Sequence, residues 1–339
     1  MTLKHILILG ANGFIGNSLV EQILAKTDWQ ITGLDLNTNN LNAHLNNPRF
    51  HFTQGDMLKQ NAWVEEQIKK CNVVLPLVAI ATPATYVQNP LKIFELDFEA
   101  NLNIVRLCVK HKKRIIFPST SEVYGMCLDK EFDEETSNLV TGPINKERWI
   151  YSCSKQMMDR VIYAYGSRGE LEYTLFRPFN WMGAKLDNIS DPKPGSSRAV
   201  TQFVGNILRG QPIPLVDGGK QHRCFTDIDD GIDALLKIIE NKNNCASQKI
   251  FNIGNPKNDY SIRELAEMII RLLKNYPKSE KFAENAKIQD ISGQEYFGKG
   301  YQDVGHRVPS IKRAQEILGW QPKVTLEEAL KKIMDYHLR

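Results

Sequence analysis

Hydrophobic positions along the chain alternate between strand-like runs and helical periodicity. The first apolar run, residues 5–9 (His-Ile-Leu-Ile-Leu), ends at Gly10. The apolar residues that follow recur at the spacing of one helix face, at Phe14, Ile15, Leu19, Val20 and Ile23. The pattern predicts a strand, a tight turn and a helix at the start of the chain.

The same alternation continues through the first half of the sequence. Strand-like runs follow at 30–34, 73–77 and 114–117, and long helical stretches lie at 90–111 and 151–166. Parallel neighbouring strands need crossover connections, which helices usually supply. The repetition therefore predicts an α/β fold with a doubly wound parallel sheet.

The pattern changes after Phe176. Prolines and glycines follow closely, at Pro178, Gly183, Pro192, Pro194 and Gly195. Later helices are predicted at 261–274, at 311–318 and after Thr325. We expect a first domain over 1–178 with a return segment at about 224–254, and a smaller C-terminal lobe over 179–223 and 255–339.

Composition narrows the class of protein. The 339 residues are 42% hydrophobic and 24% charged, enough for a large core with a smaller lobe. The net charge of +4 is spread among acids, which argues against a nucleic-acid partner. No apolar stretch approaches the roughly 20 residues of a membrane span, and the N-terminus enters a strand directly. We expect a cytoplasmic protein with no membrane partner.

The cysteines stand singly, without the paired spacing of a zinc site or the density of a disulfide scaffold. We interpret them as reduced packing residues and predict no metal site. They are Cys71, Cys108, Cys127, Cys153, Cys224 and Cys245.

A glycine-rich loop joins the first strand to the first helix. It reads Gly10-Ala11-Asn12-Gly13-Phe14-Ile15-Gly16. Glycines there let the backbone turn sharply and approach a pyrophosphate at the helix N-terminus. Asp35, at the end of the second strand, would accept hydrogen bonds from a ribose and repel a 2′-phosphate, which favours NAD over NADP. The alternative for Asp35 is a plain surface position.

Asp56 has two interpretations of equal weight. It lies where a third strand would deliver a side chain towards the adenine, and it could equally be the N-cap of a following helix.

Tyr151 and Lys155 stand four residues apart, so they share one face of a predicted helix. A tyrosine has a pKa of about 10, and a neighbouring ammonium lowers it, which lets the phenolate act as a base. A plain surface pair would show the same spacing. The glycine loop upstream, together with the run Pro118-Ser119-Thr120-Ser121-Glu122, favours the reactive interpretation.

These motifs resemble those of the extended short-chain dehydrogenase/reductase family, which acts on nucleotide sugars. The resemblance implies a Rossmann-type sheet, NAD as cofactor and a C-terminal substrate-binding lobe. It places Thr120 at the residue that binds the sugar hydroxyl. The 4,6-dehydratases of the family carry an Asp-Glu pair where this chain has Ser121-Glu122, and serine is a poor general acid. Elimination of water is therefore disfavoured.

A closer resemblance covers nearly the whole chain. It is to the ArnA-type dehydrogenase/decarboxylases of lipid A modification, which oxidise UDP-glucuronic acid at C4 and lose C6 as carbon dioxide. The similar segments are 77–83, 94–102, 114–127, 148–152, 174–183, 217–228 and 298–311. The resemblance implies a catalytic set of Tyr151, Lys155, Thr120, Ser121, Glu122 and Arg307.

The resemblance also implies binding residues. Those expected near the cofactor are Gly10, Asn12, Gly13, Phe14, Ile15, Gly16, Asp35, Asp56, Met57, Ala79 and Lys155. Those expected near the UDP-sugar are Ala81, Tyr86, Thr120, Ser121, Arg148, Asn180, Arg198, Lys220, Arg223 and Tyr301. Packing roles remain open for Tyr86 and Tyr301. This chain has Pro214 where the relatives have lysine, and Lys220 or Arg223 would have to compensate.

Other functions remain open. A UDP-xylose synthase runs the same two steps and then reduces the ketone internally, and other nucleotide-sugar epimerases or dehydratases share the reactive pair. UDP-apiose synthase carries a cysteine where this chain has Ala81, which disfavours ring contraction. A non-catalytic NAD-binding scaffold or redox sensor is the alternative outside enzymes. Relatives pair through helices equivalent to 90–111 and 151–166, so we expect a homodimer or higher homo-oligomer.

Overall fold

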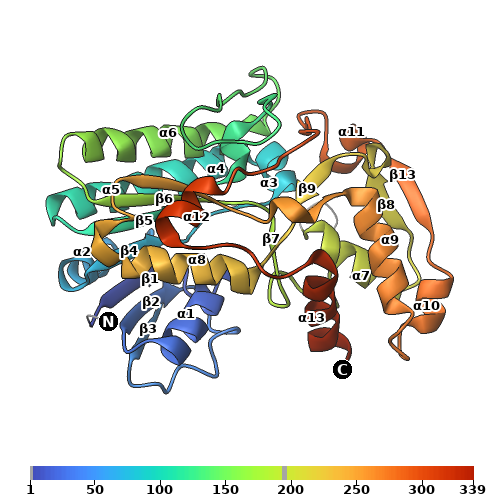
Figure 1. The fold of residues 1–339 in the computed structure, drawn as a ribbon, viewed down its shortest axis with the longest axis horizontal. Helices are drawn as coiled ribbons and strands as arrows, with labels where there is room; N and C mark the ends of the chain where they lie inside the picture. The colour runs from blue at the N-terminus through green and yellow to red at the C-terminus, as the bar shows by residue number, and fades with distance from the viewer. Residues whose placement is uncertain (1–2, 193–196) are drawn as a thin grey trace.

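The computed structural model describes residues 3–192 and 197–339 (Figure 1). Pro194 and Gly195, which contributed to the prediction of a loop-rich stretch, lie outside the described residues. A large lobe built on a sheet lies beside a smaller lobe of helices and short strands. Within the described residues, no helix is both long enough and apolar enough to cross a membrane.

A seven-stranded parallel sheet forms the large lobe, as predicted, in the order β11-β6-β5-β4-β1-β2-β3. The predicted strands are present to within one residue at each end. The order changes direction at β1, which pairs with both β2 and β4. A crevice at the carboxyl ends of the strands is expected at such a point. The strands are β1 (His5–Leu9), β2 (Gln30–Asp35), β3 (Phe50–Gln54), β4 (Val73–Pro76), β5 (Arg114–Pro118), β6 (Tyr173–Pro178) and β11 (Lys249–Ile253).

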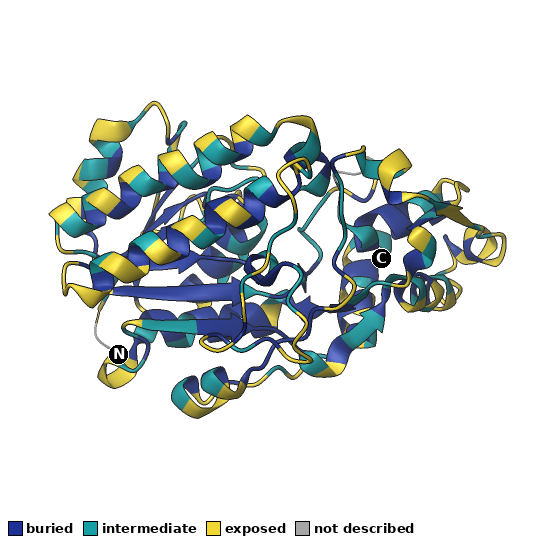
Figure 2. Ribbon diagram, turned by 90° about the horizontal axis from the view of Figure 1, so that it is seen from above, coloured by how far each residue is buried: buried dark blue, intermediate teal, exposed yellow. Residues whose placement is uncertain are grey.

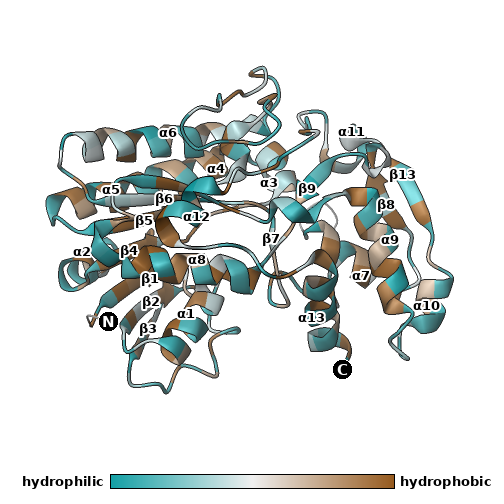
Figure 3. Ribbon diagram, viewed as in Figure 1, coloured by the Kyte–Doolittle hydropathy of each residue, from teal (hydrophilic) through white to brown (hydrophobic). Residues whose placement is uncertain are grey.

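Helices cover both faces of this sheet, because successive strand side chains point to opposite sides. Ile6 and Ile8 of β1 pack in one core with α1 (Phe14–Lys26) and α8 (Ile228–Glu240). Leu7 and Leu9 pack in a second core on the other face. The helices there are α2 (Asn61–Lys70), α5 (Asn101–Lys110) and α6 (Trp149–Ser167). Figure 2 shows the strands buried between helices whose outer faces are exposed, and Figure 3 shows the same strands as hydrophobic.

The helical stretch predicted at 90–111 is interrupted. It consists of α4 (Pro90–Ile93), a π-helical segment (Phe94–Ala100) and α5. The Asn101 side chain donates to the carbonyl of Leu96 at 2.9 Å, a local bond that competes with the regular helical ladder. Hydrophobic periodicity does not detect such a widened turn.

A separate core lies in the smaller lobe. It is formed by α7 (Ala199–Leu208), α9 (Ile262–Leu273) and α13 (Leu326–Leu338), with β8 (Ile213–Val216) pairing with β13 (Ile288–Ile291). By contrast α12 (Lys312–Leu318) packs back against the core of the sheet. The remaining elements include α3 (Pro83–Gln88), β7 (Trp181–Met182), β9 (His222–Cys224), β10 (Thr226–Asp227), β12 (Asp259–Ser261), α10 (Glu280–Glu284) and α11 (Gly293–Phe297).

The cysteines are free thiols, and most of them pack as expected. Cys71, Cys108 and Cys224 are buried, and Cys127 and Cys245 are partly buried. Cys153 is exposed, so its prediction as a packing residue was wrong. It lies on α6 between Tyr151 and Lys155 in sequence, and helical periodicity turns it away from the buried face that carries that pair.

Candidate active site

The glycine loop leaves β1 with a conformation that only glycine adopts readily. Gly10 has φ of +90°, and a Cβ on Gly16 would lie 2.2 Å from the carbonyl oxygen of Gly10. Gly13 is the N-cap of α1 and has no side chain to satisfy the first helical N–H groups. The loop therefore presents backbone donors at a helix N-terminus, as an anion-binding site requires.

Asp35 is part of this loop's structure. Its Oδ2 accepts the backbone N–H of Asn12 at 2.8 Å, and its Oδ1 accepts that of Leu36 at 2.7 Å. The Asn12 side chain in turn accepts the backbone N–H of Asn40 at 2.8 Å. Asp35 thus joins the ends of β1 and β2, and its alternative as a plain surface residue was wrong.

A cavity of about 560 Å³ lies beside this junction. Six predicted cofactor residues line it, namely Gly10, Gly13, Asp35, Asp56, Met57 and Ala79. The sequence analysis missed several others, namely Leu34, Leu36, Gly55, Leu58, Leu77, Val78, Ile80, Lys92, Glu95 and Leu96. Most of these residues are apolar, and neither they nor Lys92 and Glu95 stand in a distinctive spacing, so no motif could have identified them.

The other predicted cofactor residues do not line this cavity. Phe14 and Ile15 pack against the core of the sheet, and Gly16 allows the close approach to Gly10. Asp56, which does line the cavity, also caps a turn by accepting the backbone N–H of Leu58 at 2.9 Å. Because α2 begins only at Asn61, with Gln60 as its N-cap, the helix-cap interpretation of Asp56 was wrong.

Tyr151 is buried on α6 and stacks on Tyr86 of α3, with ring centroids 4.6 Å apart and planes 7° from parallel. Burial raises the pKa of the Tyr151 phenol well above its usual value, and the charge of Asp97 adds to this effect. A hydrogen bond with Thr120 opposes the rise in the pKa. Tyr86 therefore has the packing role that was left open for it, and this packing places it directly beside Tyr151.

Lys155 lies one turn further along α6 and is also buried. Its Nζ donates to the carbonyl of Pro118 at 2.9 Å and lies 4.8 Å from the centre of the Phe117 ring. Burial lowers the pKa of Lys155, and the carboxylates of Asp97 and Asp159 oppose that change. The predicted lowering of the Tyr151 pKa is not observed, because burial outweighs the other influences on the phenol.

Glu122 lies between two arginines from distant parts of the chain. Its Oε2 accepts from Nη2 of Arg148 at 2.7 Å, and its Oε1 lies 2.6 Å from Nη1 of Arg307. Burial acts to raise the pKa of Glu122, but the charges of Arg148 and Arg307 prevail and hold it at about 2. The carboxyl group is therefore ionised at neutral pH.

Asp303 completes this charged cluster and was missed by the sequence analysis. Its Oδ1 lies 2.6 Å from Nη2 of Arg223 and 3.7 Å from Nη1 of Arg148. Burial acts to raise the pKa of Asp303, but the arginines lower it on balance. Three arginines thus face two carboxylates, which leaves one positive charge in excess. Asp303 stands in the segment that holds Tyr301 and Arg307, but no local pattern marks it as the partner of Arg223.

Arg223 and Tyr301 line a cavity of about 150 Å³ in the smaller lobe, together with Pro214. The Arg148 guanidinium lies 5.3 Å from the centre of the Tyr301 ring, which links this cavity to the charged cluster. Arg198 pairs with Asp187 at 2.7 Å, and its charge acts to lower the pKa of Tyr151.

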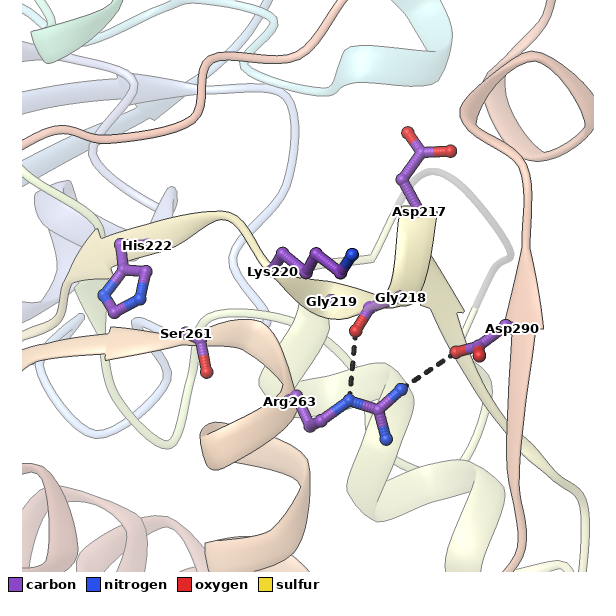
Figure 4. A pocket seen from close by; sticks show the side chains of 8 residues that line it. All are labelled: Asp217, Gly218, Gly219, Lys220, His222, Ser261, Arg263 and Asp290. Atoms are coloured by element: carbon purple, nitrogen blue, oxygen red, sulfur yellow. Dashed lines mark hydrogen bonds and ion pairs between the residues drawn. The ribbon is translucent and has the colours of Figure 1, made fainter.

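Lys220 does not join Arg223. It lines a separate cavity of about 620 Å³ with Asp217, His222, Ser261, Arg263 and Asp290 (Figure 4). Lys220 and His222 line one cavity, while Gln221 and Arg223 line the other. Lys220 itself has a helical backbone conformation after a 3-10 turn, and strand β9 begins only at His222. Lys220 and Arg223 thus line different cavities, and the expectation that one or the other contacts the sugar nucleotide stays a prediction.

The remaining predicted sugar-site residues differ in exposure. Ser121 is buried at the start of a short 3-10 turn, where Thr120 accepts the N–H of Glu122 at 3.2 Å. Asn180 has a positive φ of 41°, and its Nδ2 is buried with no partner among the described residues. Ala81 is exposed just before α3.

Comparisons with known proteins agree with this architecture. A family model described as the NAD dependent epimerase/dehydratase family matches residues 6–254. The chain is similar to the solved structure of the PbgP3 protein from Burkholderia pseudomallei, with 53% identity, a TM-score of 0.90 and coverage of 99% of this chain and 97% of that one.

Two more distant structures share the fold. One is the UDP-glucuronic acid 4-epimerase from Bacillus cereus with UDP-glucuronic acid and NAD, at 23% identity, a TM-score of 0.80 and 98% coverage of both chains. The other is the dTDP-glucose 4,6-dehydratase from Bacillus anthracis with NAD, at 22% identity, a TM-score of 0.79 and coverage of 98% and 96%.

Proposed function

The chain belongs to the NAD dependent epimerase/dehydratase family, and from this premise we propose that it oxidises UDP-glucuronic acid at C4 and releases C6 as carbon dioxide. The products are a UDP-4-keto-pentose, carbon dioxide and NADH. The observation that carries this proposal is the position of Glu122 between Arg148 and Arg307, in a cluster with one excess positive charge. A substrate carboxylate would complement that charge.

NAD is the cofactor of the family, and the residues present fit it. A Cβ on Gly16 would collide with the loop that must approach the pyrophosphate, and Asp35 lies on the wall of the neighbouring cavity as a ribose would require. Gly10, Gly13, Asp35, Met57 and Ala79 would hold the cofactor. NAD, when bound, supplies the acceptor for the hydride that leaves C4.

Tyr151 would take the proton of the C4 hydroxyl, with Thr120 orienting both groups. Burial raises the pKa of Tyr151, so the phenol is protonated at neutral pH and would have to lose its own proton to solvent before it could accept that of the C4 hydroxyl. Lys155, a cation on the same helix face, would stabilise the phenolate. Oxidation at C4 places a ketone beta to the sugar carboxylate, which then leaves as carbon dioxide because the enolate takes up the electron pair.

Arg148 and Arg307 would hold the sugar carboxylate. The incoming carboxylate competes with Glu122 for the two guanidinium groups, and loss of those contacts raises the pKa of Glu122 from about 2. Glu122, once it has taken up a proton from solvent, would deliver that proton to C5 of the enolate. Ser121, where the dehydratases of the family carry an acid, gives no general acid for expulsion of a hydroxyl.

Arg223 and Tyr301, which line the cavity in the smaller lobe, are proposed to contact the uridine diphosphate together with Arg198 and Asn180. Arg198 stands between Ser197 and Ala199, which line the same cavity. The cytoplasmic location, the homo-oligomeric state and a role in lipid A modification remain predictions from the sequence.

Incubation of the protein with UDP-glucuronic acid and NAD tests the proposal. We expect one NADH and one carbon dioxide for each substrate consumed, and a product lacking the carboxyl group by mass spectrometry. UDP-glucose, which has no carboxylate, is the matched control and should give no carbon dioxide. Carbon dioxide without net NADH indicates UDP-xylose synthase, and NADH without carbon dioxide contradicts decarboxylation.

Tyr151→Phe separates catalysis from binding. We expect turnover to fall by at least about 10²-fold, as for loss of a general base, while NAD binding stays near that of the native chain. Unchanged turnover would show that the protein does not use Tyr151 as the base, and would favour a different centre or a binding role.

A further inference from the structure

The π-helical segment Phe94–Ala100 buries a carboxylate that the steps described above do not use. Asp97 has no exposed surface. Its Oδ1 accepts the backbone N–H of Ile80 at 3.0 Å, and its Oδ2 is buried with no hydrogen-bond partner among the described residues. A buried carboxylate with one unsatisfied oxygen is costly, so a compensating interaction is expected.

The first partner of Asp97 is the backbone beside the cofactor cavity. Ile80 and its neighbours Val78 and Ala79 line that cavity. Asn101, one turn after Asp97, donates to the carbonyl of Val78 at 3.2 Å. The widened turn therefore directs two polar side chains to the same short stretch after β4, and fixes one wall of the cofactor cavity.

The second partner is the charge of Lys155. Helix α6 packs against the π-helical segment. Burial lowers the pKa of Lys155, and of the two carboxylates that raise it again, Asp97 has the larger effect and Asp159 the smaller. Asp159 is already paired with Arg177 at 3.1 Å. Asp97 has no such arginine, so its charge is the one available to balance Lys155.

The other groups that face Asp97 are neutral. Tyr151 of α6 and Tyr86 of α3 are phenols, and both feel the Asp97 charge. The stretch 77–81 after β4 contains no ionisable side chain. Lys155 is therefore the only cation in the described structure whose charge acts on the Asp97 carboxyl.

We propose that Asp97 is a positioning residue of the reactive centre, which ties the wall of the cofactor cavity to α6 and supplies the counter-charge of Lys155. The two charges are not in direct contact and act across a buried interior, where electrostatic interactions are stronger than in water. Asp97 controls the ionisation of Tyr151 and Lys155 together, since its negative charge opposes loss of a proton from both.

The protonation of Asp97 falls in an accessible range. Burial raises the pKa of Asp97 to about 6, against the opposing effect of Lys155. Above that value the carboxylate is charged and balances Lys155. Below it Asp97 is neutral, and the buried lysine loses its counter-charge. We therefore expect the affinity for NAD and the ionisation of the centre to change near pH 6.

The inference rests on the proposed function only in taking Tyr151 and Lys155 as the reactive pair, and its test needs no sugar substrate. NAD affinity is measured from pH 5 to 8 for the native chain, Asp97→Asn, Asp97→Ala and Glu99→Gln. Glu99 is an exposed acid in the same π-helical segment and is the matched control. Asparagine keeps an oxygen for the Ile80 N–H but removes the charge, whereas alanine removes both.

We expect the native chain and Glu99→Gln to show a step in NAD affinity near pH 6, and Asp97→Asn to show none. Asp97→Ala should bind NAD about tenfold more weakly at every pH, because a buried N–H loses its acceptor. Identical pH curves for the native chain and Asp97→Asn would overturn the proposal.

A titration of the native protein keeps the test independent of whether the variants fold. Carbon-13 NMR follows the Asp97 carboxyl, and a midpoint near pH 6 is expected. A midpoint at or below the ordinary value of 3.8 would overturn the proposal. Failure to turn over UDP-glucuronic acid would instead refute the proposed function and leave this result intact.

Discussion

Nη1 of Arg307 lies 2.6 Å from Oε1 of Glu122, although the two residues are far apart in the sequence. Glu122 follows β5 of the sheet, and Arg307 stands in the segment that returns from the smaller lobe to α12. The ion pair therefore forms only when the two parts of the fold are assembled. Arg307 is buried and the Glu122 side chain is only 16% exposed, so removal of one partner leaves a poorly solvated charge without its partner.

Replacement of Glu122 should separate decarboxylation from oxidation. In Glu122→Gln the arginines keep a neutral partner, but no group can carry the proton to C5. We expect carbon dioxide release to fall by about 10²- to 10⁴-fold, the usual contribution of a general acid or base. NADH and carbon dioxide are measured in parallel, with the exposed Glu131→Gln as control. A normal rate of carbon dioxide release in Glu122→Gln would exclude this role.

The stability of the folded chain should depend on the ionisation of Glu122. Its pKa is about 2 in the folded chain, below its ordinary value of 4.5, so ionised Glu122 stabilises the folded state above pH 4.5. That contribution is lost as the pH falls from 4.5 towards 2. Thermal unfolding of Glu122→Gln should show a shallower decline in Tm over this range than the native chain. Parallel curves would mean that the ion pairs do not persist in solution.

The glycine loop should not tolerate a side chain at its last position. In Gly16→Ala the new Cβ would lie 2.2 Å from the carbonyl oxygen of Gly10, so the loop must move away from the site expected for the pyrophosphate. We expect NAD affinity to fall by at least about tenfold, since one such contact accounts for about 1.5–3 kcal/mol. In Gly305→Ala, nothing lies within 4 Å of the added Cβ, and NAD affinity should be unchanged. Isothermal titration calorimetry distinguishes the two, and equal affinities would contradict the expected loop geometry.

Arg223 and Lys220 should contribute unequally to sugar-nucleotide binding, because they face different cavities. We expect Arg223→Ala to raise KM for UDP-glucuronic acid by about tenfold or more, as for loss of a charge-assisted hydrogen bond. Lys220→Ala should change KM by less than about twofold, as for a surface substitution. A larger effect at Lys220 would show that its cavity, and not that of Arg223, receives the nucleotide.

The local pattern of residues was sufficient to predict the parallel sheet, the turn after its first strand and the buried face that carries Tyr151 and Lys155. Strand and helix periods predicted the parallel sheet, because side-chain burial repeats every two residues in a strand and at about 3.6 residues in a helix. The glycine spacing predicted the turn after β1, since Gly10 and Gly16 occupy positions where a Cβ would be strained or would collide. The spacing of Tyr151 and Lys155 placed both on one buried face of α6.

The charges of the site, by contrast, were decided by contacts between distant segments. The pairing of Glu122 with Arg307, the contact of Asp303 with Arg223 and the burial of Asp97 beside α6 leave no periodic signal. The same holds for the pKa of Tyr151, which depends on burial and on Asp97 more than on its neighbour Lys155. Local periodicity records which face of an element is buried, whereas partners and ionisation depend on which elements meet, and only tertiary packing determines that.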